Sequence, residues 1–278
     1  MSNKPQFASG YPSNQAELVR QTCLYIATKL GDLMDELVII GGLVPSLLID
    51  QSNLPPEITA HIGTMDLDIG LQIALLKEER YKSLSERLRG AGFVPDTNEN
   101  GQQTRQRWIL QGSKITIDFL IQPTLPEDKG GKLRNLEADF AAIIAPGLQT
   151  AFVDREKITL KGHTIFQEET EREIWVCGAG AYIVLKALAF DSRGENKDAY
   201  DLYYVLRNFG NGIEEIVAKI HTIATDPDTT EALRILKRDF SNPNALGPRR
   251  VALFLTGGID EHIQADVVGF VGLLLNQL

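Results

Sequence analysis

Residues 63–71 read GTMDLDIGL, an apolar segment that carries two aspartates two positions apart. Side chains alternate between the two faces of a β-strand, so Asp66 and Asp68 share one face and the apolar residues at 65, 67, 69 and 71 share the other. An unpaired carboxylate is expensive to bury. The segment therefore predicts a strand over 65–73 with a core-facing side and an acidic side that needs a compensating partner.

A second stretch, KITIDFLIQP at 114–123, repeats this arrangement. Isoleucine or phenylalanine occupies positions 115, 117, 119 and 121, and Asp118 falls on the opposite face. The preceding segment TRQRWILQG (104–112) and this one flank Gly112-Ser113, which is typical of a hairpin. If the strands at 65–73 and 114–123 are neighbours, Asp66, Asp68 and Asp118 converge.

Three converging carboxylates would repel one another and raise one another's pKa values. A divalent cation removes that repulsion, and hard oxygen ligands suit Mg²⁺, which also accepts substrate phosphates as ligands. Two such ions can flank an in-line phosphoryl displacement. We therefore expect Asp66, Asp68 and Asp118 to be metal ligands, with two Mg²⁺ ions as cofactors.

Upstream, IIGGLVPSLL at 39–48 predicts a strand over 37–40, a turn at Gly41-Gly42 and a helix start at Pro45. Glycines let the backbone approach a phosphate closely, and the free N–H groups of a helix start can hold the anion. Gly41, Gly42 and the hydroxyl of Ser46 are thus candidate phosphate contacts. The alternative is a tight strand-to-helix turn without a ligand.

Strand, glycine pair, helix, D-x-D strand and a third aspartate on a later strand together resemble the nucleotidyltransferase superfamily, which includes DNA polymerase beta. The resemblance rests on Gly41, Gly42, Asp66, Asp68 and Asp118. It implies transfer of NMP from an NTP to an acceptor hydroxyl with release of pyrophosphate. In that reaction Asp66 and Asp68 would hold the metals, and Asp118 would help to deprotonate the acceptor.

Residues 186–204, KALAFDSRGENKDAYDLYY, resemble a motif of the AbiEii-like nucleotidyltransferases, the toxins of abortive-infection toxin–antitoxin pairs. The matched positions are Lys186, Arg193, Lys197, Asp198 and Asp201. The resemblance implies that Lys186 neutralises the triphosphate and that Lys197, Asp198 and Asp201 belong to the nucleotide site. It also implies a tRNA or other cellular acceptor and a separate antitoxin as partner. From the residues alone, a structural salt-bridge network joining two helices stays open.

The pattern along the chain predicts an α+β fold: a nucleotidyltransferase-type mixed sheet with flanking helices, then a mostly helical C-terminal domain. We expect a catalytic domain at 1–172 and a helical domain at 173–278. Other expected elements are a helix after Asn14 as N-cap, a helix at 77–93, and short strands within 150–177, namely TAFVD, KITLKG, HTIFQ and REIWV.

The 278 residues are 43% hydrophobic and carry 28 Lys and Arg against 37 Asp and Glu, a net charge of -9. This charge disfavours, without excluding, a nucleic-acid partner, because phosphate contacts need clustered cations. Two cysteines and a polar N-terminal stretch favour a reducing, cytoplasmic setting. The apolar run at 267–275 is too short to span a bilayer. We expect Arg105, Arg107 and Trp108 to be exposed strand residues rather than acceptor contacts.

The leading hypothesis from the sequence is therefore an Mg²⁺-dependent nucleotidyltransferase. One alternative is a catalytically silent nucleotide- or partner-binding module on the same fold. The other is a small-molecule nucleotidyltransferase of the aminoglycoside-modifying type, which shares the same site.

Overall fold

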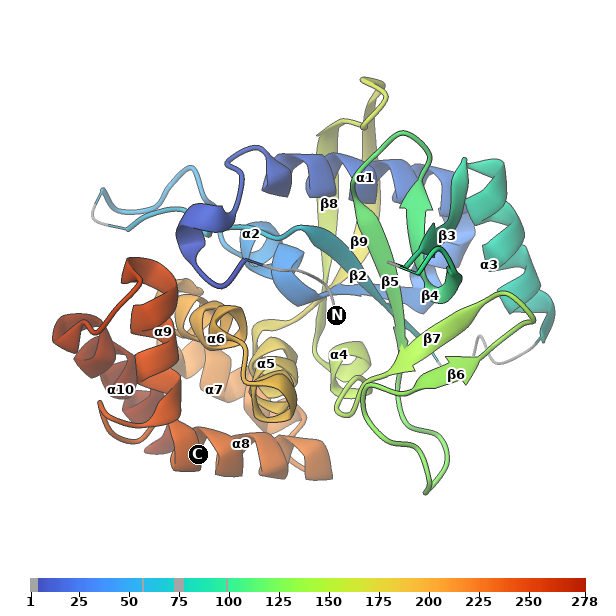
Figure 1. The fold of residues 1–278 in the computed structure, drawn as a ribbon. Coiled ribbons are helices and arrows are strands. Elements are labelled where there is room, and N and C mark those ends of the chain that lie inside the picture. Colours follow the sequence, from blue (N-terminus) through green and yellow to red (C-terminus); the bar gives the residue numbers. More distant parts are fainter. Residues whose placement is uncertain (1–4, 57, 73–77, 99) are drawn as a thin grey trace. The chain divides into compact units, whose positions relative to one another are not determined.

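The computed structural model describes residues 5–56, 58–72, 78–98 and 100–278. In these residues the protein is α+β. It contains one mixed, open sheet of nine strands, and it contains ten α-helices. The chain forms two compact units (Figure 1). Residues 14–43 and 64–177 make a sheet unit, and residues 5–13, 44–63 and 178–278 make a helical unit.

The strands of the sheet unit are β1 (Leu37–Ile40), β2 (Asp66–Leu71), β3 (Phe93–Thr97), β4 (Gln103–Leu110), β5 (Thr116–Ile121), β6 (Leu133–Asn135), β7 (Ala141–Ile144), β8 (Arg155–His163) and β9 (Glu169–Cys177). Its α-helices are α1 (Gln15–Leu30), α3 (Glu78–Gly90) and α4 (Thr150–Val153). The helical unit contains α2 (Val44–Leu48), α5 (Ala179–Arg193), α6 (Asn196–Asn208), α7 (Ile213–Thr222), α8 (Pro227–Asp239), α9 (Leu246–Thr256) and α10 (Glu261–Leu275).

The sheet runs in the order β3-β4-β5-β2-β1-β9-β8. β7, which also pairs with β6, pairs with β5 at Leu120 and Ile121, beyond the residues of β5 that pair with β4. β2 is therefore an interior strand, antiparallel to β1 and parallel to β5. Its apolar face is fully buried at Leu67, Ile69 and Leu71, as the alternating pattern predicts. Ile73, the expected end of this strand, lies outside the described residues. Lys77, the expected first residue of the helix that the structure shows as α3, also lies outside them.

The N-terminal amphipathic helix is confirmed as α1, which packs against β8 and β9. Asn14 is the N-cap residue, as predicted, but its side chain does not cap the helix. An N-cap side chain bonds the first free N–H groups from an extended backbone, whereas Asn14 has φ -92° and ψ -4°, already in the helical region. Its side chain makes no capping hydrogen bond.

The segment TAFVD was predicted as a strand and is instead the short helix α4. A turn at Gly147 starts it: Thr150 donates from both its N–H and its hydroxyl to the Gly147 carbonyl, at 3.0 and 2.7 Å. Such a short apolar run has no periodicity that separates helix from strand. KITLKG and REIWV are confirmed within β8 and β9, while HTIFQ forms mostly the turn between them.

The helical second half is confirmed, with α5, α6, α8 and α9 forming the centre of the helical unit. The apolar run at 267–275 belongs to α10. Among the described residues, none of the helices combines the length and apolarity needed to cross a bilayer. The sheet unit continues through β9 to Cys177, beyond the domain boundary expected after residue 172. Residues 5–13 and 44–63, which were expected in the catalytic domain, belong instead to the helical unit.

Candidate functional site

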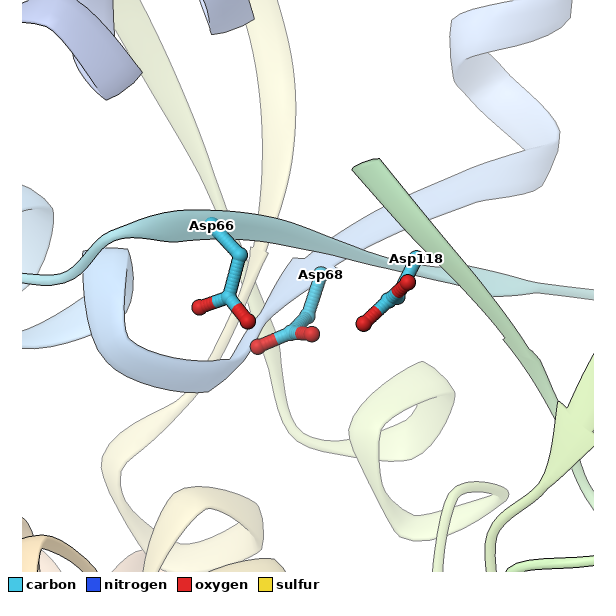
Figure 2. A group of neighbouring side chains, drawn as sticks. All are labelled: Asp66, Asp68 and Asp118. Carbon is cyan, nitrogen blue, oxygen red and sulfur yellow. The ribbon is translucent and has the colours of Figure 1, made fainter. Parts of the chain in front are cut away.

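The acidic faces of β2 and β5 lie side by side in register. Asp66 pairs with Thr116 and Asp68 pairs with Asp118 as direct neighbours in the parallel ladder. Equivalent positions of adjacent strands present their side chains on the same face. Figure 2 shows the three carboxylates pointing to one side of the two strands. The convergence predicted from the alternation of the two segments is confirmed.

One carboxylate oxygen from each of Asp66, Asp68 and Asp118 lies within 4.8 Å of the other two. Asp66 and Asp118 are buried, at 4% and 5% exposure, and Asp68 is half-buried. Three hard oxygen donors at this separation fit a divalent cation such as Mg²⁺ or Mn²⁺ rather than a metal that prefers thiolate or imidazole ligands. The triad can thus bind a metal ion, and the donor set does not by itself choose which one.

Arg107 of β4 is a cation that contacts this triad. It lies directly across from Asp118 in the antiparallel β4–β5 pair. Its Nε donates to Asp118 Oδ1 at 2.8 Å and its Nη2 to Oδ2 at 2.5 Å. The hydrogen bond to Asp118 raises the pKa of Arg107, and the charges of Asp118, Asp66 and Asp68 add to that effect. Arg107 offsets one of the three negative charges.

The expectation that Arg107 and Trp108 are exposed is wrong. The Arg107 side chain is 25% exposed and engaged with Asp118, and Trp108 is fully buried on the opposite face of β4. Arg105 is exposed, as predicted. The hairpin pattern could have found Arg107, because a turn centred on Gly112-Ser113 pairs residues equidistant from it, and Arg107 and Asp118 are equidistant.

The glycine pair lies against the same acidic segment. Gly41 has φ +72°, and a Cβ placed on it would collide with the carboxylate of Asp68. A Cβ on Gly42 would lie 2.7 Å from the Thr64 hydroxyl oxygen. Thr64, which the sequence did not single out for a role, donates from that hydroxyl to Asp66 Oδ1 at 3.1 Å. Both glycines are therefore required by close packing at the triad, whether or not a phosphate binds there.

The predicted helix start is confirmed as α2, which follows a short 3-10 segment, Gly41–Leu43. α2 is only five residues long. Ser46 lies within it and is half-buried. The structure groups Gly41 and Gly42 with the sheet unit and Ser46 with the helical unit.

The residues of the second motif form a buried ion-pair network within the helical unit. Lys186 of α5 donates to Asp198 Oδ1 at 3.0 Å and to Asp201 Oδ2 at 2.7 Å, both on α6. Lys197 also pairs with Asp201, one helical turn away. Arg193 donates from Nε to Asp198 Oδ2 at 2.6 Å and from Nη2 to Asp198 Oδ1 at 2.8 Å. These contacts form a salt-bridge network that joins two helices, which was the structural alternative to a nucleotide site in the sequence analysis.

The electrostatics of this network follow from its burial. Burial alone would lower the pKa of Lys186, but Asp201 and Asp198 outweigh it and raise that pKa. Burial also opposes ionisation of Asp201, yet Lys186 and Lys197 hold its pKa well below the usual range. For Lys197 burial prevails, and its pKa falls to about 8 despite Asp201. The charges of Lys186, Asp198 and Asp201 are thus mutually stabilised.

His61 completes this network, a role that the sequence did not indicate. Its Nε2 lies 2.8 Å from Asp201 Oδ1, and its Nδ1 accepts from the Gly63 N–H at 3.1 Å. An accepting Nδ1 places the ring proton on Nε2, which donates to Asp201. Burial and the charge of Lys197 lower the pKa of His61 to about 4, despite the contact with Asp201. His61 is therefore neutral at pH 7 and ties the segment 44–63 to α6.

Comparison of the sequence with models of known protein families and with curated proteins finds no significant match. The candidate site therefore rests on its own geometry: a carboxylate triad, an arginine bound to one of its members, and a glycine pair packed against another.

Proposed function

We propose that the protein is a metal-dependent nucleotidyltransferase that moves NMP from an NTP to an acceptor hydroxyl and releases pyrophosphate. The observation that carries the proposal is the in-register placement of Asp66, Asp68 and Asp118 on parallel strands beside a strand–Gly-Gly–helix turn. Each feature alone has an ordinary structural explanation. Their combination on one sheet supports phosphoryl-transfer chemistry, which depends mainly on positioning and charge stabilisation.

In this proposal Asp66, Asp68 and Asp118 would hold a divalent metal ion, which would supply positive charge to the triphosphate. β2 and β5 supply rigidity, because both strands are interior and bury their opposite faces in the core. Thr64 orients Asp66 through its hydroxyl. Ligands held by packed neighbours need little reorganisation when substrate arrives.

Asp118 is the proposed acceptor-activating group, and Arg107 positions it. In the present arrangement both Asp118 oxygens accept hydrogen bonds from Arg107. If Asp118 held a metal ion, its carboxylate would be shared between that ion and Arg107, because each oxygen keeps a second lone pair. The guanidinium of Arg107 lies at the triad and would be suited to bind a phosphate oxygen of the NTP.

Gly41, Gly42 and Ser46 are the proposed phosphate contacts. The close packing of Gly41 on Asp68 brings the backbone of the glycine turn next to the triad, which supports this role. Lys186, Lys197, Asp198 and Asp201 are assigned in the first place to the network that holds α5, α6 and residues 44–63 together. An RNA acceptor and an antitoxin partner remain proposals from the resemblance of residues 186–204.

The second candidate function is a nucleotide-binding module without transfer activity. The observation in its favour is the same Arg107–Asp118 pair, because Arg107 occupies both Asp118 oxygens that would otherwise accept a hydrogen bond from the acceptor hydroxyl. Calorimetry with each NTP and Mg²⁺ beside a transfer assay separates the two functions. Binding without transfer supports the module, and transfer supports the enzyme.

The direct experiment incubates the protein with each α-labelled NTP, Mg²⁺ and total cell RNA, followed by gel electrophoresis. We expect label to enter an RNA band, or the protein itself if it modifies its own hydroxyl groups. Asp66→Asn and Asp68→Asn should abolish the label, and Asp35→Asn, which changes an exposed carboxylate outside the triad, should not. Transfer that persists in both triad variants would falsify the proposed mechanism.

A further inference from the structure

A cavity of about 330 Å³ lies in the helical unit, between α9, the turn that follows it and the start of α10. It is built from residues 246–264 and uses none of the residues assigned to the carboxylate triad or to the buried network. Its volume is at the lower end of the range for small-molecule sites, so it suits a compact ligand.

The apolar part of the wall comes from Leu246, Leu253 and Ile259. Leu246 is 45% exposed and Ile259 is 81% exposed. An isoleucine this exposed beside a second exposed aliphatic residue leaves apolar surface in water that a ligand would cover. The apolar body of a ligand would therefore lie against these side chains.

Arg249 and Arg250 supply positive charge to the same cavity. In the described part of the helical unit, Arg193, Arg207, Arg234 and Arg238 each pair with a carboxylate.

Arg249 and Arg250 have no such carboxylate partner among the described residues, although the chain carries a net charge of -9. Arg250 instead donates from Nη1 to the amide oxygen of Asn196 at 3.1 Å. Two guanidinium groups at one cavity without a protein carboxylate favour an anionic ligand.

The cavity wall also holds two buried polar atoms without a hydrogen-bond partner, Nε of Arg250 and Oε1 of Gln264. Gln264 is 3% exposed, and its Nε2 donates to the Pro243 carbonyl at 2.5 Å, which assigns the amide orientation. A buried polar group without a partner is destabilising. A small rotation of the amide toward the cavity would let Oε1 accept a hydrogen bond from a ligand N–H or O–H.

We propose that this cavity binds a compact organic carboxylate that has an apolar body and one N–H or O–H donor. The ligand carboxylate pairs with Arg249 and Arg250, and the ligand N–H or O–H donates a hydrogen bond to Gln264 Oε1. The apolar body of the ligand packs on Leu246, Leu253 and Ile259. An N-acylated apolar amino acid has all three groups. The same chemistry occurs in a free small molecule and at the C-terminus of a peptide that ends in an apolar residue.

The test is an NMR titration of the full chain with N-acetyl-leucine and, separately, with N-acetyl-leucinamide, which lacks the carboxylate. A ligand of this size can bind with a Kd of roughly millimolar or tighter. We expect N-acetyl-leucine to bind at least tenfold more tightly than the amide. Absence of binding by N-acetyl-leucine, or equal binding of the two, overturns the proposal.

Variants locate the binding. Arg249→Gln with Arg250→Gln should weaken N-acetyl-leucine binding at least tenfold. Ile259→Asp also tests whether the ligand binds in this cavity, because the added carboxylate would repel an anionic ligand. The position is exposed, so the substitution leaves the buried core of the unit unchanged. Lys237→Gln removes one exposed positive charge elsewhere in the unit, on α8, and should leave binding unchanged. Binding that is insensitive to Ile259→Asp, or equally weakened by Lys237→Gln, contradicts the assigned site.

A hexapeptide with a free C-terminal leucine distinguishes the two sources of the ligand. If it binds at least as tightly as N-acetyl-leucine and competes with it, a chain terminus is the source. If only N-acetyl-leucine binds, the ligand is a free small molecule. If a short RNA oligonucleotide binds through Arg249 and Arg250 and N-acetyl-leucine does not compete, the carboxylate proposal is wrong and the arginines contact RNA phosphates.

Discussion

Arg107 and Asp118 lie directly opposite each other on neighbouring antiparallel strands and form a two-pronged ion pair, with Nε–Oδ1 at 2.8 Å and Nη2–Oδ2 at 2.5 Å. Asp118 is at the same time the in-register neighbour of Asp68 on its other side. Arg107, Asp118 and Asp68 therefore form one row across the sheet. A metal ion held by the triad would compete with the guanidinium of Arg107 for the negative charge of Asp118.

Arg107→Gln tests this competition. Removal of the guanidinium frees Asp118, and we expect the affinity for Mg²⁺ or Mn²⁺ to rise about tenfold, equivalent to ~1.4 kcal/mol. Transfer activity should fall, because the residue that positions Asp118 is gone. Calorimetric titration with Mn²⁺ measures the first effect. Arg105→Gln, an exposed change on the same strand, is the control. A weaker metal affinity in Arg107→Gln would contradict the competition.

Asp68→Asn should remove the dependence of stability on Mg²⁺. Without metal the substitution relieves repulsion between carboxylates but also removes the attraction of Asp68 to Arg107, so we expect only a small change in Tm. With Mg²⁺ the wild-type protein gains stability by mass action, and the variant should lose that gain. Thermal unfolding at several Mg²⁺ concentrations checks both effects, with Asp35→Asn as the control. An equal Mg²⁺-dependent rise in both variants would exclude the triad as the metal site.

Gly41→Ala should destabilise the protein more than an alanine at a comparable glycine. Gly131 has φ +76°, close to the +72° of Gly41, but a Cβ there meets no atom within 4 Å. Gly131→Ala should therefore show only the cost of the left-handed backbone, about 1–2 kcal/mol. Gly41→Ala adds the collision with Asp68. Equal free energies of unfolding in denaturant titrations would show that Asp68 moves away without cost.

His61 should make part of the stability depend on pH. Its pKa is about 4 in the folded protein and 6.5 in the reference state, so the unfolded chain binds the additional proton. The contribution of His61 is present above about pH 6.5 and is lost as the pH falls toward 4, by up to about 3 kcal/mol. His61→Gln should flatten the stability profile in this window. His221→Gln, at an exposed position on α7, should leave it unchanged.

Lys186→Met separates a structural role from a nucleotide-binding role. The variant leaves Asp198 and Asp201 buried with less compensation, and we expect a loss of about 3–5 kcal/mol in the free energy of unfolding. Arg193→Gln should cost much less, because the Arg193 side chain is 48% exposed. Lys186→Arg retains the charge, and NTP affinity measured on that variant reports any direct contact with phosphate. A loss of NTP affinity with unchanged stability would favour the nucleotide role.

Local patterns predicted most of the elements that carry the site. The alternation in GTMDLDIGL and KITIDFLIQP placed three aspartates on the same faces as the structure does, because strand geometry leaves only two faces. The segment TAFVD was predicted wrongly, because the contact of Thr150 with Gly147 that starts α4 is not visible as a pattern of hydrophobicity.

The sequence by itself determined the acidic and apolar faces of β2 and β5, the hairpin at Gly112-Ser113, the glycine turn and the helical second half, since each depends on residues close along the chain. Only the tertiary structure decided what compensates the charges. Arg107 reaches Asp118 through strand pairing, and His61 reaches Asp201 across 140 residues. Such partners are chosen by packing and by the high free energy of unpaired buried charge, which no local pattern records.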